Sequence, residues 1–150
     1  MKKCLLVLLI LCFTITSFAF ATSQQDADLI AAIEAEDKAS IENLLKAGAN
    51  PNKLRANPNI VDEEIAAMHI ATLFSDPSIM QLLVKYGGNV NLFSKDNITP
   101  LMLAVTEDNI AVTKYLLDNG ANINHRIDDF TVFDLIRSQE MADLLQKYSQ

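Results

Sequence analysis

The sequence has little of several residue types, and each shortage excludes a class of function. Tryptophan is absent, and both cysteines, Cys4 and Cys12, lie near the start of the chain. The rest of the chain therefore cannot form a disulfide, supply a thiol nucleophile or bind a metal through cysteine. Glycine and proline occur four times each in 150 residues, while 50% of the residues are hydrophobic. This composition is typical of a chain that packs a core.

The first 21 residues have the pattern of a secretory signal peptide. Lys2 and Lys3 supply a positive start, residues 4–13 form an uninterrupted apolar run, and residues 19–21 read Ala-Phe-Ala. Signal peptidases recognise this order of charged, apolar and small residues. A permanent transmembrane helix is the alternative, but the run is shorter than the ~20 apolar residues that span a bilayer. We therefore predict cleavage after Ala21 and a single domain over residues 22–150.

Basic residues are also scarce. The chain has 12 Lys and Arg against 19 Asp and Glu, for a formal net charge of −7, and loss of Lys2 and Lys3 with the leader would make it −9. An acidic surface repels phosphate backbones and anionic lipid headgroups. We therefore predict that the mature chain binds neither nucleic acid nor membrane.

A helix-ending pattern occurs three times. Residues 44–52, 83–91 and 116–124 each begin with Leu-Leu or Leu-Val and continue to a Gly and an Asn-x-Asn turn. The three glycines, Gly48, Gly87 and Gly120, are 39 and then 33 residues apart. Glycine adopts the left-handed conformation that ends a helix at little cost. Helical spacing of Leu, Ile and Ala between the turns, together with this period, indicates stacked helical units.

The sequence here resembles the ankyrin-repeat family, whose unit of 33 residues opens with Thr-Pro-Leu-His-x-Ala. Residues 99–104 read Thr-Pro-Leu-Met-Leu-Ala, residues 66–71 are a weaker copy that keeps His69, and residues 131–135 are a degraded copy. The resemblance implies an all-α solenoid of about four stacked units, over residues 27–52, 53–91, 92–124 and 125–147, with a β-turn finger before each helix pair. It also implies a structural His69 that hydrogen-bonds loop backbone between neighbouring repeats. Thr99 is expected to cap a helix whose first turn holds Pro100.

Two departures from the repeat pattern are visible. Six extra residues lie within 53–65, compared with the next finger, and predict a longer first finger. The last unit has room between Leu135 and Leu145 for one helix and a stub, as is usual for the end of a solenoid. His125 follows the last Asn-x-Asn turn, and we expect it to be exposed.

The sequence lacks the patterns that carry catalysis or metal binding. Serine-hydrolase, zinc-protease and phosphate-loop motifs are absent, and the two histidines are 56 positions apart. The acidic residues 62–64 and 128–129 lack the spacing of a calcium loop, so we expect solvated turns. We predict a protein that is not an enzyme and has no cofactor and no metal.

By resemblance, the fingers and the exposed side of each first helix form a concave face that binds other proteins. Apolar residues are unusual in that region, and we predict a partner-binding site at Leu73, Phe74, Phe93, Lys95 and Asp96. Packing of Leu73 and Phe74 under the first finger is the alternative. The sequence thus predicts a monomeric adaptor exported to the periplasm or secreted, which binds another protein. An inhibitor or immunity-type protein that blocks an exported enzyme is the second hypothesis.

Overall fold

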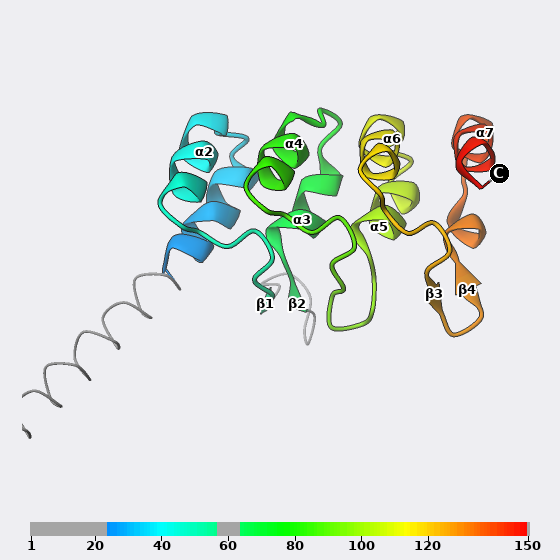
Figure 1. The fold of residues 1–150 in the computed structure, drawn as a ribbon, viewed down its shortest axis with the longest axis horizontal. Helices are drawn as coiled ribbons and strands as arrows, with labels where there is room; N and C mark the ends of the chain where they lie inside the picture. Colours follow the sequence, from blue (N-terminus) through cyan, green and yellow to red (C-terminus); the bar gives the residue numbers. More distant parts are fainter. Residues whose placement is uncertain (1–23, 57–63, 150) are drawn as a thin grey trace, which may run out of the picture.

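The computed structural model describes residues 24–56 and 64–149. Helices in these ranges form two rows, and loops and hairpins project as fingers from one edge of the stack (Figure 1). The predicted leader lies outside the described residues, as do residues 57–63, which include Asp62 and Glu63. Glu64, the last of the three acidic residues there, is exposed.

Each unit contributes one helix to each row. The first helices are residues 24–34, α3 (Ala67–Ile70) with its 3₁₀ extension η1 (Ala71–Leu73), α5 (Pro100–Thr106) and the 3₁₀ turn η2 (Val132–Leu135). The second helices are α2 (Lys38–Lys46), α4 (Ser78–Lys85), α6 (Ile110–Asp118) and α7 (Gln139–Tyr148). The last unit has one full helix and a short 3₁₀ turn, so the prediction of a single helix and a stub is confirmed.

The fingers precede the first helices. In the first finger β1 (Arg55–Ala56) pairs antiparallel with β2 (Glu64–Ile65), and in the last β3 (Arg126–Ile127) pairs with β4 (Phe130–Thr131). The finger between them, residues 92–98, is a loop without strand pairing. These hairpins have only two residues per strand, which agrees with the weak strand signals in the sequence and with an all-α fold.

Three glycines end the second helices, as the sequence predicts. Gly48, Gly87 and Gly120 have φ values of 102°, 90° and 84°. The residue after each glycine donates its backbone N–H to a carbonyl of the helix that has just ended, for example Ala121 N to Leu116 O at 2.9 Å. The left-handed glycine thus turns the chain back over its own helix end and satisfies a terminal carbonyl.

The helix starts are capped by side chains. Thr99 Oγ1 accepts from Met102 N at 3.2 Å and Pro100 follows it in the first turn, as predicted. Asp37, Asn109 and Ser138 cap α2, α6 and α7 in the same way. These caps satisfy N–H groups that a helix cannot satisfy itself.

Asparagine side chains join successive units. Asn52 donates Nδ2 to Gly87 O at 2.8 Å and accepts from Asn89 N at 2.7 Å. Asn91 repeats both bonds one unit later, to Gly120 O at 2.9 Å and from Asn122 N at 2.7 Å. Each amide bridges two backbone groups of the next turn, so it fixes the spacing of the units and hence of the fingers.

One continuous core lies between the two helix rows. The helical spacing of Leu, Ile and Met places these side chains at the interfaces within and between units. The largest fully buried side chains include Leu29, Ile33, Ile41, Met68, Ile79, Met80, Leu83, Leu101, Leu116, Met141 and Leu145.

Candidate functional site

In the part of the chain that the structure describes, the large exposed apolar side chains all belong to fingers or first helices. Leu73, Phe93, Phe130 and Phe133 are 59%, 47%, 60% and 39% exposed. They lie at the end of η1, in the finger 92–98, in β4 and in η2, which are all finger or first-helix positions. Among the described residues, the second helices expose no large apolar side chain. Apolar surface that could bind a partner is therefore confined to the fingers and first helices.

An apolar hollow on this side lies between α5 and the last finger. It has a volume of about 370 Å³. Met102, Leu103 and Thr106 form its α5 wall, while Ile127, Phe130 and Leu135 lie opposite. Ile98 and Asp128 complete the lining. Met102 and Thr106 are four residues apart in α5, so they share one side of the helix. We call this hollow the α5–finger groove.

The last finger is held so that Phe130 reaches this groove. Ile127 pairs with Phe130 across the hairpin, and the two-residue turn Asp128-Asp129 joins the strands with Asp128 at φ 53°. Below the turn, Thr131 donates both its N–H and its hydroxyl to Asp134 Oδ2, at 2.8 and 2.7 Å. These hydrogen bonds hold the pKa of the Asp134 carboxyl below its ordinary value. The negative charge of Asp134 therefore helps to fix β4 on η2.

Phe93 and His125 join the last two fingers. Their ring centroids are 4.8 Å apart and the rings are tilted by 34°. His125 Nε2 lies 2.9 Å from Asn97 O in the same finger as Phe93. The expectation that His125 is merely exposed is wrong, because the ring is half-buried and contacts the neighbouring finger. No local sequence pattern indicates this contact, since it depends on the stacking distance between two loops.

Leu73 and Phe74 are located at the other end of the first helices. Leu73 lines a small hollow together with residues 107–111, which form the loop after α5 and the start of α6, and Phe74 packs half-buried against the core. Asn109 Nδ2 donates to Phe74 O at 2.8 Å. The finger with Phe93 precedes α5, whereas this loop follows it. The structure therefore separates Leu73 and Phe74 from Phe93 instead of placing them side by side, as we expected from the sequence.

Lys95 and Asp96 are exposed at the tip of the finger 92–98. The buried Ser94 organises this tip, because its hydroxyl accepts from Asp96 N at 3.3 Å and Ile98 N at 3.1 Å. Lys95 N also donates to Glu64 O of the preceding finger at 3.3 Å. Both side chains are thus free to face a partner, and their predicted role in binding stays a prediction.

His69 has the structural position that the resemblance implies. Its ring is 1% exposed, Nδ1 accepts from Ala66 N at 3.2 Å, and Nε2 lies 3.1 Å from Ile98 O of the next finger. The ring therefore ties the start of α3 to the finger that precedes α5. Because Ile98 lines the α5–finger groove, the contact of His69 with Ile98 O helps to fix one wall of that groove.

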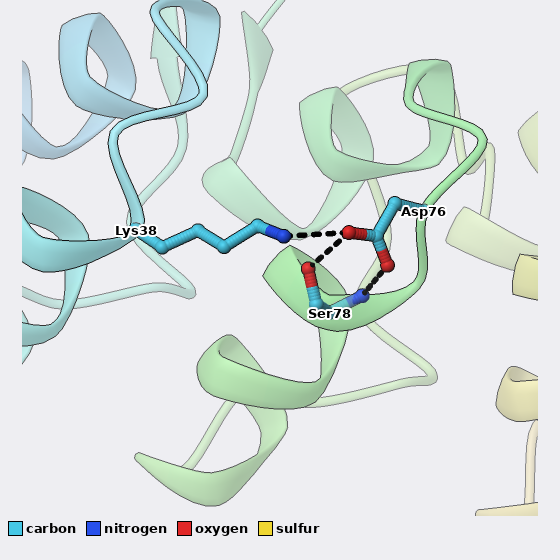
Figure 2. A network of polar contacts seen from close by, with 3 residues as sticks. All are labelled: Lys38, Asp76 and Ser78. Atoms are coloured by element: carbon cyan, nitrogen blue, oxygen red, sulfur yellow. Dashed lines mark hydrogen bonds and ion pairs between the residues drawn. The ribbon is translucent and has the colours of Figure 1, made fainter.

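The second helices carry ion pairs instead of apolar groups. Figure 2 shows Lys38, at the start of α2, with its Nζ 2.6 Å from Asp76 Oδ2. Ser78 donates its hydroxyl and its N–H to the same carboxylate at 2.7 and 3.0 Å. The hydrogen bond from Lys38 is the main cause that lowers the pKa of Asp76 from 3.8 to about 2. Both side chains are half-exposed, so the pair orients neighbouring units without much net stabilisation.

A second inter-unit cluster surrounds Glu42. Lys85 Nζ and the Tyr86 hydroxyl both bond Glu42 Oε1, at 3.1 and 3.0 Å, and Lys46 Nζ lies at 3.4 Å. The hydrogen bond from Lys85 is the main cause of the lowered pKa of Glu42. Lysines in this row are thus neutralised by neighbouring acids.

Sequence reasoning missed the exposed rings of the last unit. Phe133 belongs to the degraded copy of the repeat opening, residues 131–135, and Phe130 directly precedes that copy. A signal was present, since Phe130 follows an acidic two-residue turn and would be expected at a hairpin edge. Leu103 and Thr106 gave no such signal, because helical spacing alone does not distinguish groove from core.

Among residues 24–56 and 64–149, no group of three or more His, Cys, Asp or Glu side chains is placed to hold a metal ion. Within the same residues, no helix has both the length and the apolar character needed to cross a membrane.

Comparison with known proteins finds ankyrin repeats in the same part of the chain where the structure shows stacked helix pairs. Residues 29–127 match the family model of ankyrin repeats, in three copies. The chain is 30% identical over 109 residues to alpha-latrocrustotoxin-Lt1a of Latrodectus tredecimguttatus, which covers 71% of this chain and 7% of the toxin. It is 30% identical over 87 residues to the nuclear factor NF-kappa-B p105 subunit of Gallus gallus, covering 56% of this chain and 8% of that protein.

A solved structure has the same fold. The crystal structure of the ankyrin repeat domain of Bcl-3 superposes with a TM-score of 0.69, at 22% identity, over 79% of this chain and 50% of the other. The chain spans less than a tenth of the length of the two relatives named above. The shared part is therefore the repeat array and not the whole of those proteins.

Proposed function

Because the chain belongs to the ankyrin-repeat family, whose repeats are protein–protein interaction modules, we propose that it is a non-catalytic adaptor that binds a partner protein through its concave face. One observation carries the proposal: in the described residues every large exposed apolar side chain lies in a finger or a first helix. Such side chains are the usual anchors of an interface when polar groups surround them. The second helices present paired charges instead, which gain little from contact with a partner.

Site-specific photo-crosslinking in the source cell tests this proposal. A photoreactive phenylalanine analogue replaces Phe130 or Phe93 on the proposed face, and Gln81 or Lys114 on the second helices as matched exposed controls. We expect a crosslinked protein at the first two positions and none at the controls. Crosslinks confined to the second helices would show that the partner binds the opposite side.

Export of the chain is part of the same proposal and rests on residues 1–21. The charged start, apolar run and Ala-Phe-Ala sequence support a cleaved leader. N-terminal sequencing of the protein from the periplasm or the culture medium is expected to begin at Thr22. Retention of Met1 to Ala21 in a membrane fraction would contradict export as a soluble protein.

An inhibitor or immunity-type role for an exported enzyme is the second candidate. It is favoured by the net charge of −7, which suits a basic target. The crosslinked partner distinguishes the two roles. If the partner is an enzyme, an inhibitor must lower its activity at stoichiometric concentration, whereas an adaptor must leave its activity unchanged.

A further inference from the structure

Resting on the proposed function, we infer that the α5–finger groove is the anchor site for one large apolar side chain of a basic peptide segment in the partner. The segment would place a leucine or phenylalanine in the groove and a lysine or arginine beside the turn Asp128-Asp129.

The lining of the groove supports an apolar anchor. Apart from Thr106 and Asp128, every lining residue is apolar. Its volume of about 370 Å³ is near the lower end of the range of roughly 300–1,000 Å³ for binding pockets, so it suits a side chain more than a large ligand. Phe130 borders the groove and is more than half exposed. A partner side chain inserted beside this ring would remove apolar surface of both molecules from water.

The charge at the edge of the groove supports a basic ligand. Asp128 lines the groove, and Asp129 beside it is fully exposed. Arg126 has its Nη2 3.9 Å from Asp129 Oδ1, and both side chains are largely in water. A pair with this distance and exposure is weak, and it leaves the carboxylate available to an incoming cation. The acidic charge of the whole chain would attract the same segment from a distance.

A second copy of this chain fits the groove poorly. A symmetric contact through Phe130 would bring Asp128 and Asp129 of both molecules together, and like charges across an interface are unfavourable. Anionic lipid headgroups are disfavoured for the same reason. The occupant with complementary charge is therefore a basic segment of another protein.

Selection from a random peptide library tests the inference. A phage-displayed library of random twelve-residue peptides is selected on the immobilised protein, and the enriched peptides are synthesised for affinity measurement. We expect enriched sequences to carry a leucine or phenylalanine with lysine or arginine nearby. Failure to enrich any sequence, or enrichment of acidic peptides, would overturn the inference.

Matched variants locate the binding site of the enriched peptides. Phe130→Ala and Thr106→Lys should each weaken binding at least tenfold, the first by removing apolar contact and the second by placing a cation in the groove. Phe133→Ala removes an exposed ring that does not line the groove and should leave the affinity unchanged. Unchanged binding to both groove variants would overturn the inference, and melting temperatures identify any variant that fails to fold.

Charge is tested separately. Asp128→Asn with Asp129→Asn should weaken binding at least threefold in low salt, and asparagine tolerates the positive φ of residue 128. Glu34→Gln with Glu140→Gln changes the net charge equally at distant exposed positions and serves as the control. Equal effects of the two pairs would show that the turn does not contact the ligand. Analytical ultracentrifugation measures self-association. A dimer that forms with Phe130 and is lost in Phe130→Ala would identify a second copy as the occupant and would also overturn the inference.

The site of peptide contact separates this inference from the proposed function. Chemical-shift changes in the methyl groups of Ile98, Leu103 and Ile127 on peptide addition would support the groove. Chemical-shift changes around Phe93 alone would contradict peptide binding in the groove but would keep the concave face as the binding surface. Changes confined to α2, α4 and α6 would contradict both.

Discussion

In the first two Asn-x-Asn turns the two asparagines have different partners. The first closes its own turn, as when Asn91 N donates to Asn89 Oδ1 at 2.9 Å, and the second bonds the turn of the following unit. A repeated tripeptide in the sequence thus encodes one local and one inter-unit contact. The local contact follows from the known tendency of asparagine to bond backbone two residues on. The inter-unit contact could not be predicted, because it depends on how closely the units stack.

Asn91→Ala is expected to loosen the joint between the second and third units. The change removes two hydrogen bonds, to Gly120 O and from Asn122 N, each contributing ~0.5–1.5 kcal/mol, so we expect a loss of about 1–3 kcal/mol in the free energy of unfolding. Chemical denaturation measures it. Asn43→Ala, at an exposed position of α2, is the control and should change stability little. If both variants unfold at the same denaturant concentration, the bridge contributes nothing.

Gly88 directly follows the helix-ending Gly87, and the packing of the core explains why this position is a glycine. A Cβ at Gly88 would lie 2.4 Å from Met68 Sδ and 2.8 Å from Leu83 O. The corresponding residues in the first and third units are Ala49 and Ala121. Met68 stands where the third unit has Leu101, so its sulfur occupies the space that an alanine methyl fills elsewhere. The glycine at this position therefore complements a methionine.

Gly88→Ala should destabilise the protein by ~1–3 kcal/mol through overpacking. Met68→Leu with Gly88→Ala restores the combination of the third unit, Leu101 with Ala121, and should recover the part of that loss caused by the Met68 sulfur, while the close contact with Leu83 O remains. A double-mutant cycle by chemical denaturation measures the coupling. Strictly additive effects of the two substitutions would refute the proposed contact.

At the scale of helices and fingers, the sequence predicted what depends on local pattern. Helix ends at Gly48 and Gly120, the cap at Thr99 and the shortened last unit all follow from residue types at fixed spacing. The positions of Phe93, His125 and Phe130 depend on how neighbouring fingers approach one another, and no local pattern encodes that approach. For this reason the fold was predicted well and the α5–finger groove was not.

The ion pair between Lys38 and Asp76, which joins the α2 and α4 units, makes the folding stability depend on pH. The sign of this dependence follows from the pKa of Asp76. The folded pKa of Asp76 is about 2, below the value of 3.8 for a free aspartate. Its contribution to stability is therefore complete above pH 3.8 and is lost as the pH falls from 3.8 through about 2. The carboxylate is well exposed, so salt is expected to screen this contribution.

Lys38→Met should raise the pKa of Asp76 toward 3.8, and Ser78→Ala should raise it less, because the hydrogen bond from Lys38 is the largest cause of the shift. Carboxyl resonances followed by NMR during acid titration measure both. Lys53→Met, at an exposed lysine in the first finger, provides the control. A pKa of Asp76 that stays near 2 without Lys38 would mean that the observed ion pair is not formed in solution.

At the scale of the whole molecule, the two helix rows have different chemical characters. The second helices join units through paired charges such as Lys85 and Glu42, while the fingers and first helices expose apolar rings. Hydrogen bonds from asparagine and His69 hold the fingers at fixed spacing, so the apolar groups are arranged before a partner binds. Such preorganisation lowers the entropic cost of association.

Hydrogen–deuterium exchange of the complex tests the central claim, binding through the concave face, most directly. The partner identified by crosslinking is added to the protein, and amide protection is compared with that of the free protein. We predict added protection in residues 92–106 and 126–135, with little change in α2, α4 and α6. Added protection confined to those second helices, with the fingers exchanging as in the free protein, would contradict the account.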